Sequence, residues 1–205
     1  HFLEHLTFRS KDIAKRIEDL GGDINAYTTL DRTVYYLTLP KDYSEEGLKV
    51  LSDIFYSTEF TEQSFDTEKD VILEEMKRSY DDPQREIYKT FFEKTLKNHP
   101  AKRPVIGYEN TIKNAEKNAI ISFYKNFYTN DNSFLVIVGD LTTQEELEKN
   151  ILKYFKHKKF SGHTTTKTTK EEVRVNTGLH IKKKNIKSCY LMAGFLTPDI
   201  YSEDV

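Results

Sequence analysis

Residues 21–39 read Gly-Gly-Asp-Ile-Asn-Ala-Tyr-Thr-Thr-Leu-Asp-Arg-Thr-Val-Tyr-Tyr-Leu-Thr-Leu. Two runs rich in β-branched and aromatic residues, 23–30 and 33–39, flank the polar pair Asp31-Arg32. Such residues suit a pleated, half-buried surface, and a short polar break between two runs is typical of a hairpin turn. The stretch therefore predicts two antiparallel strands, and Gly21-Gly22 is a suitable end for a helix that precedes them.

Helical periodicity surrounds this hairpin. Before it, Ile13, Ile17 and Leu20 recur at the spacing of one helix face. The same reasoning predicts helices over residues 1–8, 11–20, 44–57, 61–80, 84–97, 114–127 and 143–155, and a further strand over 133–138. Strands and helices mix without a regular βαβ alternation. We therefore expect an α+β fold with a largely antiparallel sheet and helices packed on one face.

Length and composition limit the class of protein. The 205 residues are 37% hydrophobic and 31% charged, which indicates a globular chain rather than a disordered one. A formal net charge of −2 gives no basic surface for nucleic acid or membrane binding. No apolar run approaches the roughly 20 residues that span a bilayer. We expect no nucleic-acid or membrane partner, a cytoplasmic location, and a buried thiol at Cys189, the single cysteine.

The tract 161–172 is rich in threonine and lysine and has no apolar period, so we interpret it as a linker. We expect 1–160 to form one domain and 173–205 to begin a second, similar domain that is truncated. The N-terminal part of the first domain is expected to lie upstream, because the chain opens directly on the chemically important His1. Two strands are predicted in the second domain, over 173–182 and 188–196.

The segment His1-Phe2-Leu3-Glu4-His5 has the pattern H-x-x-E-H, the reverse of the common zincin motif. Positions four apart share a helix face, so both imidazoles can reach one ion. Glu4 projects from nearly the same side, where it could act as a general base on a water that the metal activates. Imidazole is a preferred zinc ligand, and a catalytic zinc takes three protein ligands with one open position. The third ligand must come from elsewhere in the chain.

The helix expected over 61–80 offers three carboxylates for that position: Glu68, Glu74 and Glu75. Glu68 and Glu75 are seven residues apart, or two turns, and share a face with apolar neighbours. Glu74 is rotated about 100° from Glu75 and should be more exposed. Taken alone, such glutamates are typical of a solvated helix surface, and a short motif is only suggestive. The two patterns together favour a metal site.

These residues resemble the inverzincin metallopeptidases, the family of pitrilysin, insulin-degrading enzyme and mitochondrial processing peptidase, and in particular its bacterial processing proteases. His1–His5 matches the family's signature, and Glu68–Glu75 matches its downstream E-x6-E element. The resemblance implies that Glu75 is the third zinc ligand, together with His1 and His5. It also implies that Glu68 supports the site from behind the ligands.

The segment Gly21–Thr28 resembles the family's Gly-Gly-x-x-Asn-Ala segment, an edge strand that pairs with extended substrate. The resemblance implies that Asn25 and Ala26 bind substrate. Two departures stand out. The stretch between Phe8 and Lys11 is several residues shorter than usual, which indicates a missing loop. The arginine and tyrosine, spaced seven apart, that the family's second half-domain supplies are not identifiable.

We therefore predict a Zn²⁺-dependent endopeptidase acting on peptides or unfolded proteins, with Glu4 as general base. A second half-domain or partner subunit is expected to complete the site, and an apolar docking face would favour a dimer. The alternative is a non-catalytic scaffold or partner subunit of the same fold. Such scaffolds lack intact ligands and base, whereas all four residues are present here. A zinc-stabilised binding domain is a third reading, but structural zinc sites usually close with four protein ligands.

Overall fold

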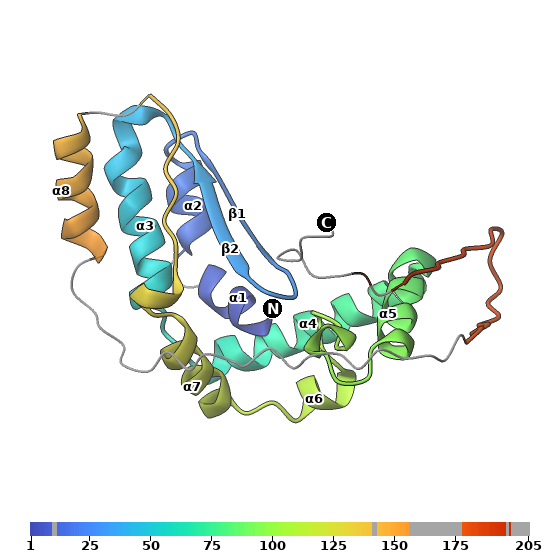
Figure 1. Cartoon of the computed structure of the whole chain (residues 1–205). Coiled ribbons are helices and arrows are strands. Elements are labelled where there is room, and N and C mark those ends of the chain that lie inside the picture. The colour runs from blue at the N-terminus through green and yellow to red at the C-terminus, as the bar shows by residue number, and fades with distance from the viewer. Residues whose placement is uncertain (10–11, 141–142, 156–177, 196, 198–205) are drawn as a thin grey trace. The chain divides into compact units, whose positions relative to one another are not determined.

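A β-hairpin forms the sheet, as the sequence predicts. The computed structural model describes residues 1–9, 12–140, 143–155, 178–195 and 197. Strand β1 (Asp23–Thr28) pairs antiparallel with β2 (Thr33–Thr38), and within the described residues the sheet has these two strands (Figure 1). The α+β class with an antiparallel sheet is confirmed.

Helices make up most of the rest of the described chain. In order they are α1 (Phe2–Phe8), α2 (Ile13–Glu18), α3 (Ser44–Tyr56), α4 (Glu62–Asp81), α5 (Pro83–Thr95), α6 (Glu109–Lys113), α7 (Lys117–Phe127) and α8 (Gln144–Phe155). The break between α4 and α5 has a local cause. Asp82 caps α5 by accepting from the backbone N–H of Gln84 at 2.8 Å, and Pro83 occupies the first helical position. None of the helices in the described part of the chain is both long and apolar enough to cross a membrane.

The chain divides into two compact units. The first comprises His1–Glu74 and Val105–Thr166, and the second comprises Glu75–Pro104 and Lys167–Val205. The division falls inside α4, which is one continuous helix on both sides of it.

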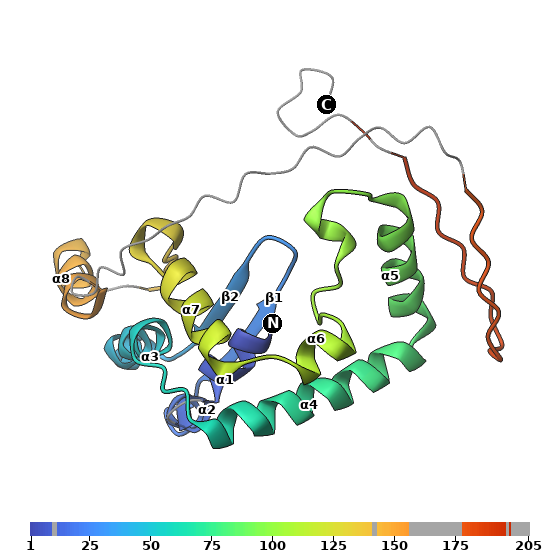
Figure 2. The ribbon, with the colours of Figure 1, turned by 90° about the horizontal axis from the view of Figure 1, so that it is seen from below.

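In the first unit, helices cover one face of the hairpin. Both α1 and α2 pack against β1 (Figure 2). The core beneath the hairpin is a cluster of aliphatic residues from α2, β1 and α3: Ile13, Ile17, Ile24, Val50 and Ile54. Exposure alternates along β1, with Ile24 buried and Asp23 and Asn25 exposed, because successive side chains of a strand point to opposite faces. Thr28 lies on the same face as Ile24 and so points toward the helices.

In the second unit, residues 178–195 contact α5 and the last turn of α4. Lys182 forms an ion pair with Glu86, and Lys184 Nζ donates to the Tyr80 carbonyl oxygen at 2.6 Å. The strands predicted over 173–182 and 188–196 are wrong for the residues described, because 178–182 and 188–195 form no ladder. Cys189 is exposed rather than buried. The predicted linker 161–172 lies outside the described residues.

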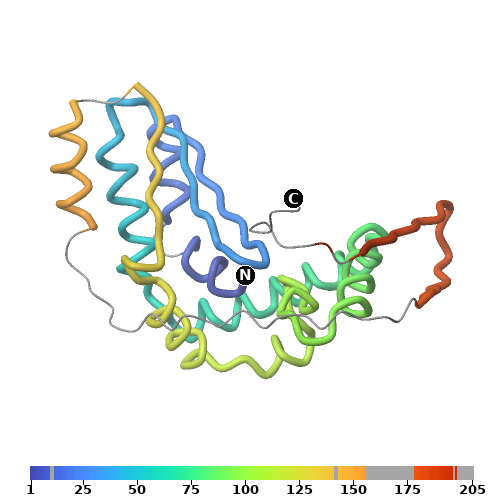
Figure 3. Tube along the Cα trace, in the orientation of Figure 1, coloured from blue at the N-terminus to red at the C-terminus, as the bar shows by residue number. Residues whose placement is uncertain are grey.

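The strand predicted over 133–138 is also wrong for the described part of the chain. The segment is an extended trace that leads from α7 toward α8 (Figure 3), but it belongs to no sheet. Phe134, Val136 and Val138 are 99%, 80% and 92% exposed, respectively. The composition is typical of a strand, but a strand also needs a hydrogen-bonded neighbour, and the described residues supply none here.

The helix expected over 114–127 begins at Lys117 as α7, and the separate helix α6 (Glu109–Lys113) ends just before the predicted range. Asn114 ends α6, and its side-chain amide donates to the Asn110 carbonyl oxygen at 2.8 Å. Glu116 then takes extended backbone angles before α7 begins. Asparagine competes with the helix ladder through such local bonds, and this explains why the helix starts three residues later than expected.

Candidate metal centre

Helix α1 carries three of the candidate side chains. His1 stands at its N-cap, and Glu4 and His5 lie within it, all three half-buried. The opposite side of the helix is buried, and Phe2 stacks on Phe65 of α4 with ring centroids 5.1 Å apart. This apolar contact holds α1 against α4.

The three predicted ligands lie together. One ligand atom each from His1, His5 and Glu75 comes within 4.8 Å of the other two, and the imidazole centroids are 4.7 Å apart. Zinc bonds of about 2.0–2.2 Å place tetrahedral ligands roughly 3.4 Å apart, so each pair of these atoms would have to close by roughly 1.4 Å at most around a zinc ion. Two imidazoles and one carboxylate are a donor set of catalytic zinc. Among the described residues this is the only group of three or more potential ligands found.

The phase of α4 agrees with the sequence argument. Glu74 is exposed, Glu75 is half-buried, and Ile72 is fully buried. Glu75 is the residue directly after the division between the units, but its place relative to Ile72 follows from less than one turn of continuous helix. The geometry brings Glu75 to the histidines, and its role as a ligand remains a prediction.

Glu68 is a carboxylate with only 1% of its surface exposed. Its Oε2 lies 3.1 Å from His5 Nδ1, and its Oε1 lies 2.8 Å from Arg9 Nε. A buried carboxylate is costly unless it is paired, and Arg9 supplies the pairing charge. A hydrogen on His5 Nδ1 directed at Glu68 leaves Nε2 as the basic nitrogen, which is the tautomer that a metal requires.

Arg9 was not among the residues picked out from the sequence. The signal was available, because Arg9 follows His5 by four positions and therefore shares its helix face. Residues 10–11, where the family resemblance suggests a missing loop, lie outside the described residues.

Glu4 is held by the hairpin. Thr28 Oγ1 donates a hydrogen bond to Glu4 Oε2, and the same hydroxyl lies 3.2 Å from Thr33 Oγ1 on β2. Thr28 was also missed in the sequence. The alternation along β1 places it on the inward face with Ile24, and this was the available signal.

A chain of three hydroxyls lies beneath α1. Thr7 Oγ1 is 3.0 Å from the Leu3 carbonyl oxygen and 2.9 Å from that of Glu4. It is also 2.7 Å from the Tyr35 hydroxyl, which is 2.7 Å from the Tyr128 hydroxyl. Burial raises the pKa of Tyr35 to about 12 and the pKa of Tyr128 well above its usual value. Both phenols therefore stay protonated at neutral pH.

The predicted substrate-binding residues lie on β1, outside the ligand group. Asn25 is exposed and Ala26 is half-buried. The Ala26 N–H donates to Asn25 Oδ1 at 2.8 Å. This donor is therefore satisfied by the side chain of its neighbour.

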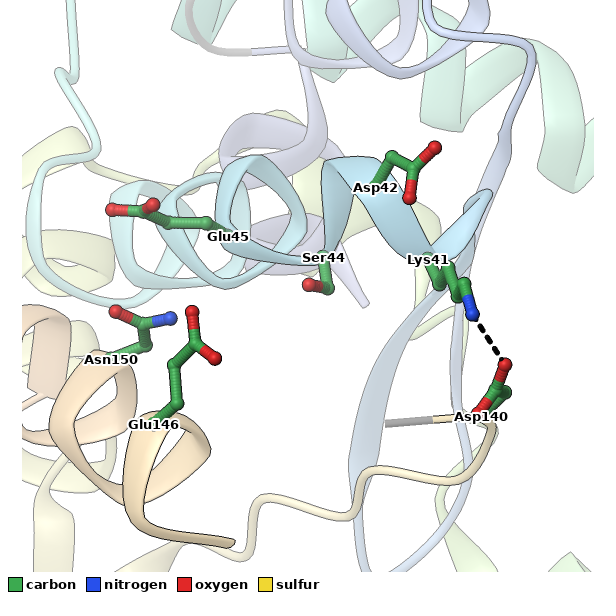
Figure 4. Close-up of a pocket in the computed structure, with 7 residues that line it drawn as sticks. All are labelled: Lys41, Asp42, Ser44, Glu45, Asp140, Glu146 and Asn150. Atoms are coloured by element: carbon green, nitrogen blue, oxygen red, sulfur yellow. Dashed lines mark hydrogen bonds and ion pairs between the residues drawn. The ribbon is translucent and has the colours of Figure 1, made fainter. Parts of the chain in front are cut away.

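A separate pocket of about 240 Å³ lies where α3 and α8 begin (Figure 4). Its lining is mostly carboxylate, with Asp140 already paired to Lys41 at 2.7 Å. None of the predicted site residues lines it. The zinc chemistry expected from the sequence therefore falls on α1 and α4.

Comparison with known proteins agrees with the geometry. Residues 1–109 match the family model described as insulinase (peptidase family M16), and residues 114–205 match the one described as peptidase M16 inactive domain. The chain belongs to peptidase family M16. The family expected from the sequence is thus confirmed, and the range matched to the insulinase model contains the candidate residues His1, Glu4, His5, Glu68 and Glu75.

Relatives of this M16 chain are named zinc proteases. An uncharacterized zinc protease of Rickettsia felis is 32% identical over 147 residues, covering 69% of this chain and 36% of the relative. The uncharacterized zinc protease YmxG of Bacillus subtilis is 27% identical over 201 residues, covering 95% of this chain and 48% of YmxG. The crystal structure of a protease from Helicobacter pylori matches with a TM-score of 0.76 at 26% identity, over 84% of this chain and 44% of that one. The chain thus spans less than half the length of each.

Proposed function

We propose that this M16 chain is the metal-binding part of a zinc-dependent endopeptidase. In this proposal His1, His5 and Glu75 hold the zinc, and Glu4 is the general base. The strongest support is the approach of the three ligand atoms to within 4.8 Å of one another, beside a glutamate on the same helix as the histidines.

A bound zinc ion would polarise the scissile carbonyl and lower the pKa of the attacking water. The protein's own contribution begins with Glu4, which accepts the proton of that water and later delivers it to the leaving amine. A carboxylate has two oxygens, so Thr28 can hold Oε2 while Oε1 accepts the proton. Glu68 and Arg9 keep His5 in the tautomer with a basic Nε2, as their contacts indicate.

The substrate in this proposal is a peptide or unfolded protein bound in extended form along β1. Backbone hydrogen bonds to a strand give affinity without demanding one sequence. Asn25 and Ala26 are suitably placed, because Asn25 is exposed and already satisfies the Ala26 N–H in place of a peptide carbonyl. We further propose that residues beyond this chain, as a second half-domain or a partner subunit, complete the substrate site.

The alternative proposal is a non-catalytic scaffold of the same fold. One observation favours it, namely the match of residues 114–205 to the inactive-domain model. All four candidate residues, however, lie in the range that matches the insulinase model.

Metal analysis of the full-length protein, together with a peptide-cleavage assay, distinguishes the two proposals. The peptidase should contain one zinc per site, lose cleavage in a chelator and regain it when zinc is restored. A protein that holds zinc but cleaves no peptide under any of these conditions would be a scaffold.

A further inference from the structure

We propose that Tyr128, Tyr35 and Thr7 act as positioning residues whose hydroxyl chain fixes the rotation of α1 about its axis. Glu4 and His5 are carried by the turn that this chain holds. The inference rests on the proposed peptidase function, because it assigns positioning residues to that site. These residues act through the backbone of α1 and not on the reacting atoms.

The donor and acceptor in each hydrogen bond of the hydroxyl chain follow from its Thr7 end. The carbonyl oxygens of Leu3 and Glu4 can only accept, so the hydrogen of the Thr7 hydroxyl is shared between them. Thr7 Oγ1 then accepts from Tyr35, and the Tyr35 oxygen accepts from Tyr128. Each of the first two hydroxyls gives one hydrogen bond and receives one, and Tyr128 is the terminal donor. Loss of the middle hydroxyl therefore disturbs both of its neighbours.

Helix α1 needs such an anchor. It has seven residues, fewer than the about 12–15 at which an isolated helix becomes marginally stable, so tertiary contacts set its position. Apolar contacts such as Phe2 on Phe65 are non-directional, whereas hydrogen bonds fix both distance and angle. The hydroxyl chain reaches the carbonyl of Glu4 itself, the candidate base.

Tyr128, at the other end of the hydroxyl chain, is firmly packed. Tyr128 follows α7 directly and is 9% exposed. Its ring lies 5.0 Å from that of Tyr124 and 5.7 Å from that of Phe55, measured between centroids. The hydroxyl chain thus connects α1 through β2 to the end of α7, so residues 121 positions apart in sequence set the orientation of one short helix.

The test compares variants of the three hydroxyl residues, the chain variants, with a matched control in the zinc-loaded full-length protein. Tyr35→Phe and Thr7→Val should each lower both zinc affinity and kcat by about 10-fold or more, as loss of a supporting contact commonly does, while KM changes little. Tyr128→Phe should have a smaller effect in the same direction, because it removes only the terminal donor. Thr7→Ser keeps the hydroxyl and should restore both quantities.

Tyr124→Phe is the control. Tyr124 lies on α7, the helix that Tyr128 directly follows, and is 4% exposed. Its hydroxyl donates to the Phe55 carbonyl oxygen at 2.6 Å and takes no part in the hydroxyl chain. Its loss of stability should be similar, with zinc affinity and kcat unchanged. The double variant Tyr35→Phe with Thr7→Val should add little to either single change, whereas Tyr124→Phe with Thr7→Val should be additive.

A readout that needs no metal is hydrogen exchange of the α1 amides in the metal-free protein, which should quicken in the chain variants and not in Tyr124→Phe. If Tyr35→Phe and Thr7→Val match Tyr124→Phe in zinc affinity, kcat and exchange, the positioning role is overturned while wild-type cleavage leaves the peptidase proposal intact. If the wild type neither holds zinc nor cleaves peptides, the peptidase proposal fails. The exchange rates alone then decide whether the chain fixes α1, and equal rates in all variants overturn it.

Discussion

Two regions of the structure concentrate carboxylates, and they differ in what surrounds them. Around α1 and α4, Glu68 is 1% exposed and both of its oxygens are engaged, by His5 and Arg9. In the pocket where α3 and α8 begin, Glu45 has 50% of its side chain exposed and pairs with Lys153, itself 57% exposed, at 2.6 Å.

The two regions differ in how strongly each carboxylate depends on its partners. A buried carboxylate must be matched by partners in a defined geometry, so its replacement disturbs a network. An exposed ion pair is screened by water, and either partner can be lost at small cost. The number of carboxylates alone does not distinguish the two regions, whereas burial and the contact with a histidine do.

The largest expected effect is that of Glu4→Gln. The amide has the shape of the carboxylate but cannot accept a proton, so turnover should fall by about 10²–10⁴-fold while zinc content stays near wild type. Steady-state cleavage and metal analysis on the same preparation measure both. Full turnover in a zinc-replete variant would show that Glu4 is not the base.

Next is the contrast of Glu75→Ala with Glu74→Ala. The first removes a proposed ligand and should abolish zinc binding, whereas the second changes an exposed neighbour on the same helix and should leave it unchanged. Zinc titration against a competing chelator measures the two affinities. The placement of the third ligand is wrong if Glu74 proves essential and Glu75 dispensable.

A smaller loss is expected from Glu68→Gln, because its side chain contacts His5, a proposed ligand, and is not itself one of the proposed ligands. Zinc affinity or activity should fall by about 10–100-fold, and Arg9→Gln should shift both less, in the same direction. The matched control is Glu62→Gln on the same helix, whose side chain is 73% exposed and pairs with Lys117. Equal behaviour of the Glu68 and Glu62 variants would remove the distinction drawn between buried and exposed carboxylates.

The smallest effect is expected in the pocket. Glu45→Gln removes the partner of Lys153 and Tyr154 from a solvated surface, so cleavage, zinc affinity and the midpoint of thermal unfolding should all stay near wild type. A substantial fall in cleavage would instead give the pocket a functional role.

Periodicity predicted much of the fold. It gave most helices, and it placed Glu75 and Glu74 with the correct relative exposure, because one helix phase fixes both. The two strands of the hairpin followed instead from their β-branched and aromatic composition and the polar pair between them. The predictions failed where the local structure depends on a partner distant in sequence. Residues 133–138 have the composition of a strand, yet no described neighbour pairs with them.

The contacts that hold the site were harder to predict. Thr28 reaches Glu4, and Tyr128 reaches Tyr35, across 24 and 93 positions of sequence. Such pairs depend on how elements pack and leave no local period to detect. The domain limits and the cytoplasmic location expected from the sequence remain predictions.

The contact between Thr28 and Glu4 couples the register of the hairpin to the position of the proposed general base. Asn25 and Thr28 are three residues apart, so a strand presents one outward and the other inward. A shift of β1 by one residue exchanges its two faces, which would turn Thr28 away from the glutamate and bury Asn25. A shift by two would restore the faces. Insertions of one residue before Asn25 should therefore disrupt the contact with Glu4 far more than insertions of two, although they are shorter.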